Sequence, residues 1–111
     1  MKRFFEPERV ALIGASGTKT RPGYHLFSNL NAGFGERFYP VNPRAASIEQ
    51  KTCYSSVLDI PFEIDAAVIF IPSRSVPSAL EQCGKKGIPR VIIESPSPSE
   101  RREAIRLGGG G

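Results

Sequence analysis

The sequence contains few metal-binding residues and no long apolar stretch. Its single histidine, His25, and its two cysteines, Cys53 and Cys83, lie far apart along the chain, so they do not form a metal-ligating motif. No apolar run approaches the roughly 20 residues that a membrane span needs. Residues 1–8 lack the apolar core of a signal peptide. We therefore expect a cytoplasmic protein with reduced cysteines and neither a metal site nor a membrane partner.

The basic residues lack the clustering that is typical of nucleic-acid binding. The chain of 111 residues has a formal net charge of +4, but adjacent basic residues occur only as isolated pairs, at residues 2–3, 85–86 and 101–102. Dispersed cations near a loop suit a small anionic ligand better than a nucleic acid. The composition, 40% hydrophobic and 23% charged, is typical of a globular protein, and the length allows one compact domain.

Short apolar runs alternate with amphipathic segments along the chain. The runs predict strands at residues 9–13, 37–41, 66–71 and 90–93, with a shorter strand at 53–54. Helices are expected at residues 22–32, 75–86 and, after a capping box, 97–107. This alternation predicts an α/β, Rossmann-like three-layer domain with a parallel sheet of four to five strands. We assign residues 1–107 to this domain and residues 108–111 to a flexible glycine tail or truncated linker.

Individual residues add detail to these elements. Pro40 removes a ladder donor from the second strand, so we expect that strand at an edge of the sheet. In the second helix the buried face is expected to contain four apolar residues spaced at i, i+3, i+4 and i+7: Val76, Ala79, Leu80 and Cys83. Residues 45–56 are polar and are expected to be irregular apart from the short strand.

The first strand leads into a loop of small and basic residues. Where a strand is followed by such a loop and then a helix, the backbone N–H groups and the positive end of the helix dipole are available to an anion. Ser16 stands where a Gly-x-Gly-x-x-Gly motif has its second glycine, and no Walker Gly-Lys-Ser/Thr follows. The alternative is a tight turn without a ligand. The candidate contacts are Gly14, Ser16, Gly17, Thr18, Lys19 and Arg21.

The turn after the second strand, Asn42–Pro43–Arg44, points to the chemistry of the ligand. A typical NAD site has an acid here that binds the ribose hydroxyl, whereas an arginine favours a ribose phosphate. Such a phosphate is the 2′-phosphate of NADP or the 3′-phosphate of coenzyme A. A solvated turn arginine is the alternative.

No residue forms a catalytic motif. His25 has no acidic partner nearby in sequence, and Ser73 lacks the Gly-x-Ser-x-Gly elbow of a nucleophile. Glu63 and Asp65, just before the third long strand, are expected to be solvated loop residues. We therefore assign no catalytic residue.

Four stretches together resemble a known family: Phe5–Ser16, Tyr39–Arg44, Ser56–Pro61 and Ile64–Pro72. They are similar to the N-terminal CoA-binding domain of NDP-forming acyl-CoA synthetases, which are related to the α subunit of succinyl-CoA synthetase. The resemblance extends from about residue 4 to residue 93 and implies coenzyme A or an acyl-CoA as the ligand. ATP-grasp and ligase domains of the same enzyme are the implied partners, and the chain itself is expected to be non-catalytic.

The resemblance also implies roles for individual positions. Residues 16–19 match the loop on the CoA phosphates, and Arg44 matches the basic residue at the 3′-phosphate. The turn Ile71–Pro72–Ser73 matches a segment lining the nucleotide cleft. Glu94 and Ser95 match a third contact segment, where the family usually has small residues and glycine. Two alternatives to the CoA-binding module therefore remain. One is an NADP-binding domain of an oxidoreductase or sensor, and the other is an interaction or assembly domain whose ligand site has decayed.

Overall fold

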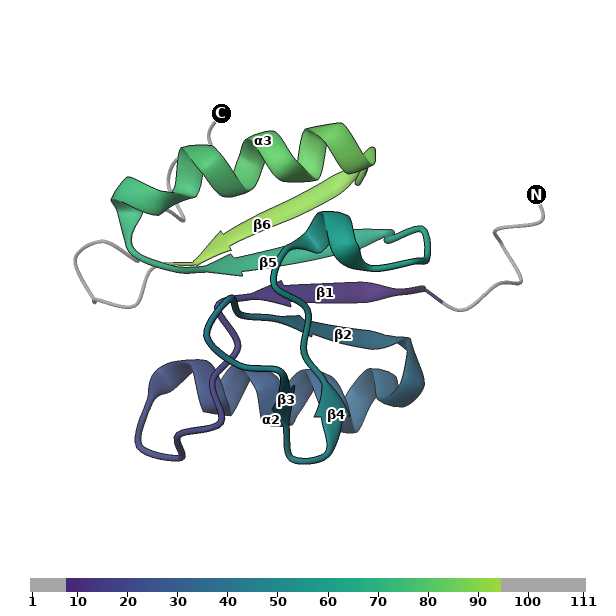
Figure 1. Ribbon diagram of the computed structural model, residues 1–111. Coiled ribbons are helices and arrows are strands. Elements are labelled where there is room, and N and C mark those ends of the chain that lie inside the picture. The colour runs from purple at the N-terminus through teal and green to yellow at the C-terminus, as the bar shows by residue number, and fades with distance from the viewer. Residues whose placement is uncertain (1–7, 95–111) are drawn as a thin grey trace.

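The computed structural model describes residues 8–94, which form a parallel sheet with one helix on each face (Figure 1). The elements in chain order are β1 (Val10–Ile13), α2 (Pro22–Phe34), β2 (Phe38–Val41), β3 (Ser47–Ile48), β4 (Lys51–Thr52), β5 (Ala66–Phe70), α3 (Val76–Lys86) and β6 (Arg90–Glu94). Three short 3-10 turns join them: η1 (Gly35–Arg37), η2 (Val57–Asp59) and η3 (Ser73–Ser75). The helix expected at 97–107 and the glycine tail lie outside the described residues.

The strand order of the main sheet is β2-β1-β5-β6, and every neighbouring pair is parallel. Helix α2 connects β1 to β2, and α3 connects β5 to β6 on the other side of β1. This arrangement confirms the predicted Rossmann-like α/β fold with four strands in the sheet. Strand β2 is an edge strand, as Pro40 predicts, and its outer side carries one parallel bridge between Val41 and Tyr54.

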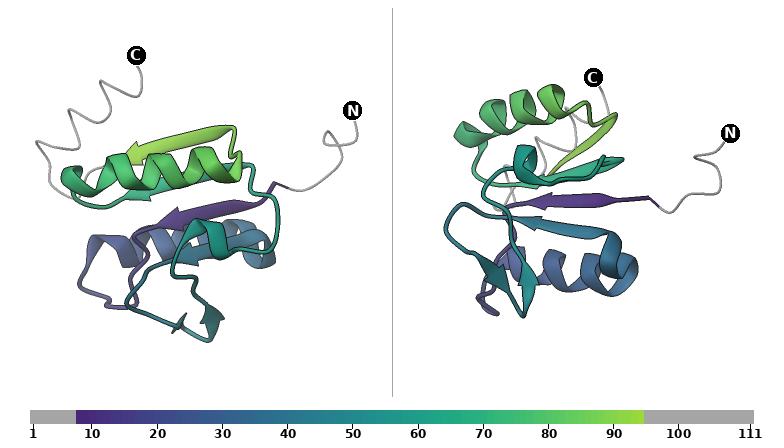
Figure 2. Two further views of the ribbon diagram at one scale, coloured as in Figure 1. Left: turned by 45° about the horizontal axis from the view of Figure 1, so that its top comes forward. Right: turned by 45° about the vertical axis from the view of Figure 1, so that its right-hand side comes forward.

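Helices α2 and α3 cover opposite faces of the sheet (Figure 2). Each face builds a separate core, because alternate residues of each strand point to opposite sides. On one face Ile13 and Ile69 join Cys83 of α3 in one buried cluster. On the other face Leu12 and Phe38 join Phe27 of α2. Burial on both faces explains why the central strands are continuously apolar in sequence.

Two helix predictions need correction. Helix α2 runs through Gly33 to Phe34, and Gly35, at a φ of 57°, ends it instead. In α3, Ala79 and Cys83 are buried as predicted, but Leu80 is 39% exposed. Turn η2 packs beside α3, where Lys86 Nζ donates to the carbonyl of Ile60 at 2.7 Å. The buried face of α3 therefore includes Ala79 and Cys83, and Leu80 lies at its exposed margin.

Residues 45–56 are more regular than expected, because β3 and β4 form an antiparallel hairpin. Its two-residue turn consists of Glu49 and Gln50, whose φ angles are 49° and 71°. The Tyr24 hydroxyl donates to Glu49 at 2.6 Å and Lys51 Nζ to the carbonyl of Gly35 at 3.0 Å, so both contacts tie the hairpin to α2 and its C-terminal cap. The hydrogen bond to Glu49 raises the pKa of Tyr24. The strand predicted at 53–54 is reduced to the Tyr54 bridge.

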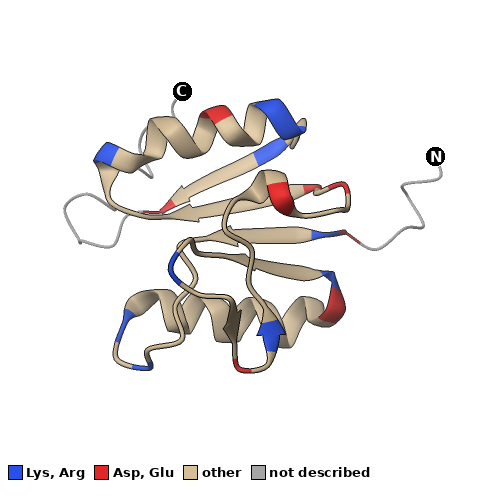
Figure 3. Cartoon of the chain, viewed as in Figure 1, with Lys and Arg blue, Asp and Glu red and all other residues tan. Residues whose placement is uncertain are grey.

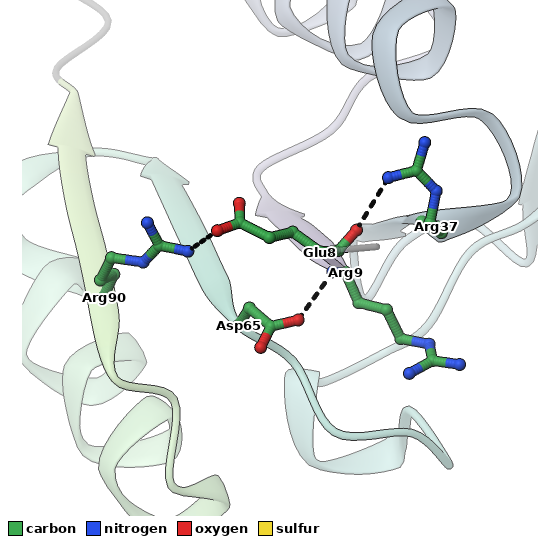
Figure 4. A network of polar contacts seen from close by, with 5 residues as sticks. All are labelled: Glu8, Arg9, Arg37, Asp65 and Arg90. Carbon is green, nitrogen blue, oxygen red and sulfur yellow. Dashed lines mark hydrogen bonds and ion pairs between the residues drawn. The ribbon is translucent and has the colours of Figure 1, made fainter. Parts of the chain in front are cut away.

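A polar network joins the amino-terminal ends of the strands (Figure 4). The Arg9 amide donates to Asp65 Oδ2 at 2.8 Å, Arg90 pairs with Glu8, and Arg37 donates to the Glu8 carbonyl at 3.3 Å. Asp65 is only 8% exposed, so the expectation of a solvated loop carboxylate is wrong. Its position beside the first residue of β5 makes it a link between that strand and β1.

Candidate functional site

A cleft of about 890 Å³ opens at the carboxyl-terminal ends of the strands. Its walls come from the loops after β1, β2 and β5 and from one side of α3. Ligands of open α/β sheets bind at this edge, where the strand order reverses. Nine of the residues predicted from sequence line it: Gly14, Ser16, Thr18, Arg21, Asn42, Pro43, Arg44, Ile71 and Pro72.

Four predicted residues that the structure describes do not line the cleft. Gly17, Lys19 and Ser73 lie in the same loops but outside its lining. Glu94 ends β6 at the edge of the sheet, paired with Phe70. Ser95 lies outside the described residues.

Two glycines bring the β1–α2 loop close to the sheet. Gly14 has a φ of 108°, and a Cβ there would collide with the carbonyl oxygen of Phe70 in β5. A Cβ on Gly23, in the first turn of α2, would lie 2.6 Å from the carbonyl oxygen of Gly14. Only glycine permits both approaches, so the loop passes close to the end of β5 and the first turn of α2 packs against the residue that follows β1.

The amides of the β1–α2 loop divide into two groups. The Val41 carbonyl accepts from the amides of Gly14 and Ala15, at 3.0 and 3.3 Å, and Ser16 Oγ accepts from the Thr18 amide at 3.1 Å. Within residues 8–94, the amides of Ser16 and Gly17 form no hydrogen bond. The number of amides available to an anion is therefore smaller than the sequence suggests.

Asn42 connects the β1–α2 loop to the turn after β2. Its Nδ2 donates to the carbonyl of Ala15 at 2.7 Å, and its Oδ1 accepts from the Arg44 amide at 2.8 Å. Both ends of the side chain are engaged by the protein, so its contribution to the cleft is to hold the backbone of Arg44 beside the β1–α2 loop.

Three arginine side chains, each from a different loop, line the cleft. Arg21 precedes α2, Arg44 follows β2, and Arg74 lies in η3 after β5. Within residues 8–94, no aspartate or glutamate lines the cleft. Figure 3 shows basic positions on the loops at the edge toward which the arrows of β1, β2 and β5 point. Sequence reasoning missed Arg74, although its place two residues after Pro72, just beyond a strand end, was available as a signal.

One wall of the cleft is neutral and polar. We call it the α3 wall; it consists of Ser55, Ser75, Ser78 and Gln82. Ser56, next to this wall, donates from its hydroxyl to Gln82 Oε1 at 2.8 Å and accepts from the Leu58 amide at 3.1 Å. This contact joins the segment after the Tyr54 bridge to helix α3. It was not predicted from the sequence.

Two further features among residues 8–94 lie outside the lining of this cleft: a second hollow and the two thiols. A second hollow of about 510 Å³ beside the hairpin is lined by Glu36, Glu49 and Lys51, so its two carboxylates outnumber its one cation and it is less suited to an anion than the cleft. Burial raises the pKa of both thiols, Cys53 and Cys83. Within residues 8–94 we find no group of three potential metal ligands, and neither helix has the length and apolar character to cross a membrane.

Known proteins resemble this chain in sequence and in structure. The sequence model of a family described as a CoA binding domain matches residues 8–108. The chain belongs to this family. As a CoA-binding domain it is 43% identical over 104 residues to an ADP-forming acetate–CoA ligase II of Archaeoglobus fulgidus, covering 93% of this chain and 16% of that protein. Over 90 residues it is 41% identical to the α subunit of an ADP-forming acetate–CoA ligase II of Pyrococcus furiosus, covering 81% of this chain and 20% of the subunit.

Solved structures show the same relationship. A dinucleotide-forming acetyl-coenzyme A synthetase 1 from Ca. Korarchaeum cryptofilum, in complex with phosphate and ADP, superimposes with a TM-score of 0.77 at 32% identity. The match covers 96% of this chain and 24% of that one. The chain thus spans a quarter or less of these relatives, and corresponds to the CoA-binding module of NDP-forming acyl-CoA synthetases.

Proposed function

We propose that this domain binds coenzyme A, or an acyl-CoA, in the cleft at the carboxyl-terminal edge of the sheet. The observation that carries the proposal is the lining of that cleft by Arg21, Arg44 and Arg74 without an acidic residue among residues 8–94. Arginine suits phosphate recognition because its planar fork of N–H donors matches phosphate oxygens. Coenzyme A offers three phosphates in two groups, a diphosphate and a 3′-phosphate on the ribose, so it can use cations from separate loops.

The arrangement of donors suggests where each group binds. The amide of Ser16 and the side chains of Thr18 and Arg21 line the cleft near the start of α2, where the helix dipole favours the diphosphate. Arg44 lies at the end of β2, the position that accommodates a ribose phosphate in dinucleotide-binding folds. The cleft volume falls within the usual range of about 300–1,000 Å³ for small-molecule sites.

The wider role is proposed from the relatives. Those named above are acetate–CoA ligases and an acetyl-CoA synthetase, of which this domain matches a quarter or less. We propose that the domain presents coenzyme A to ATP-grasp and ligase domains that carry out acyl activation. No catalytic step is assigned to its own residues.

Calorimetric titration tests the site. We expect coenzyme A to bind more tightly than dephospho-CoA, which lacks the 3′-phosphate. Arg44→Gln should weaken coenzyme A binding by about ten- to a hundredfold, because one charge-assisted contact contributes roughly 1.5–3 kcal/mol. The same substitution should affect dephospho-CoA much less. Lys85→Gln, an equal charge change on an exposed part of α3 outside the cleft, is the matched control.

The outcomes separate the alternatives. Equal affinity for coenzyme A and dephospho-CoA would remove the role of Arg44. A thermal shift with NADPH and none with coenzyme A would favour the dinucleotide alternative. Absence of binding to either CoA form would overturn the proposed function.

A further inference from the structure

The α3 wall differs from the rest of the cleft in its chemistry. The described cations of the cleft lie in the loops, whereas the wall presents three serine hydroxyls and the amide of Gln82. Charged phosphates are attracted to the loops, so a neutral part of the ligand is left to contact the wall. The neutral part nearest to the ribose phosphate of coenzyme A is the adenine base.

The wall also lies beside the place expected for the ribose. Asn42 fixes the turn that carries Arg44, and the Asn42 amide donates to the Tyr54 carbonyl at 2.8 Å. The next two residues, Ser55 and Ser56, reach the wall and its Gln82. A ligand whose ribose phosphate contacts Arg44 therefore has its base within reach of this side of α3.

The terminal amide of Gln82 is held in one orientation. Ser56 Oγ accepts from the Leu58 amide, which leaves the hydroxyl proton to donate to Gln82 Oε1. Oε1 keeps a second lone pair, and Nε2 forms no hydrogen bond within residues 8–94. The cleft side of Gln82 thus offers one donor and one acceptor side by side.

We infer that Gln82, oriented by Ser56, reads the adenine base of the bound nucleotide; this inference rests on the proposed function. A glutamine amide matches adenine because it donates to a ring nitrogen and accepts from the 6-amino group. Hypoxanthine has an oxygen at position 6, which would face Oε1 and repel it. Rotating the amide to accommodate hypoxanthine would turn Nε2 toward Ser56 and leave the Ser56 hydroxyl proton without its acceptor, Oε1. Gln82 is accordingly the specificity residue and Ser56 a positioning residue.

The test compares coenzyme A with its deaminated form, in which hypoxanthine replaces adenine. We expect the unmodified domain to bind coenzyme A at least about tenfold more tightly, since a matched amide–base pair discriminates by that order. Gln82→Met, which preserves side-chain length without hydrogen-bonding groups, should reduce the ratio to nearly one. Ser56→Ala should reduce the ratio as well, and Ser56→Thr, which keeps the hydroxyl, should restore it. Arg44→Gln should weaken both ligands and leave the ratio unchanged.

A second measurement covers variants that fold poorly. The side-chain amide resonance of Gln82 in the unmodified domain should shift on saturation with coenzyme A and shift less with the deaminated form. Equal affinity for the two ligands, or an unchanged ratio in Gln82→Met, would overturn this inference alone. Failure of coenzyme A itself to bind would overturn the proposed function instead.

Discussion

The side-chain amide of Asn42 donates to the backbone carbonyl of Ala15 at 2.7 Å, and this bond joins the loops that follow β1 and β2. The same side chain accepts from the Arg44 amide. Asparagine is needed because the position requires a donor toward one loop and an acceptor toward the other.

Asn42→Asp should therefore separate the two loops. The new carboxylate still accepts from the Arg44 amide but repels the Ala15 carbonyl, and it adds a negative charge to the cleft. We expect a loss of about 1–3 kcal/mol in the free energy of unfolding, measured by urea denaturation, and weaker coenzyme A binding. Asn29→Asp, on the exposed side of α2, is the control and should change stability by less than about 0.5 kcal/mol.

The close glycine contacts of the β1–α2 loop predict a second result. Gly14→Ala combines a positive φ with a collision against Phe70, so it should cost more than about 3 kcal/mol or prevent folding. Gly23→Ala should cost about 1–3 kcal/mol because Cβ approaches the Gly14 carbonyl. Gly33→Ala, within the same helix but with open space around it, should stabilise by about 0.5–1 kcal/mol. Thermal denaturation distinguishes the three, and equal effects would contradict this packing.

The hairpin turn predicts a stabilising substitution. Gln50 has a φ of 71°, which costs a non-glycine residue roughly 1–2 kcal/mol. Gln50→Gly should raise the free energy of unfolding by about 1 kcal/mol, measured by urea denaturation. Gln50→Ala also removes the side chain but keeps Cβ, so it should give no such gain. A stabilisation by alanine equal to that by glycine would show that the side chain, and not the backbone, carries the strain.

The network at the amino-terminal edge allows a comparison of buried and exposed contacts. Asp65→Ala leaves the Arg9 amide without its acceptor in a buried setting, and should cost about 1.5–3 kcal/mol. Glu8→Ala removes only an exposed ion pair with Arg90 and keeps the Glu8 carbonyl that Arg37 contacts, so less than about 1 kcal/mol is expected. Denaturant unfolding in low and high salt measures both. A larger loss for Glu8→Ala would contradict this ranking.

Residues adjacent in sequence were predictable, and those joined by packing were not. Val10–Ile13 is continuously apolar because a central parallel strand is covered on both faces, and this pattern identified it. Arg44 lines the cleft as predicted, because the residues after the second strand of such a sheet lie at its ligand-binding edge. Gln82 and Ser56 are 26 residues apart, and only the packing of η2 against α3 brings them together. The hairpin of β3 and β4 was not predicted, because its turn residues, Glu49 and Gln50, are not the Asn-Gly pair that is typical of such turns.

The two edges of the sheet differ in how their charges are arranged. At the amino-terminal edge, Arg90 and Glu8 neutralise one another, whereas the three arginines of the cleft meet no described acid across it. A field of this kind extends into solvent and guides an approaching anion toward one end of the molecule. Encounter with a phosphorylated ligand is therefore expected to be fastest in dilute buffer and to slow as added ions shorten the Debye length, which is about 8 Å at physiological ionic strength.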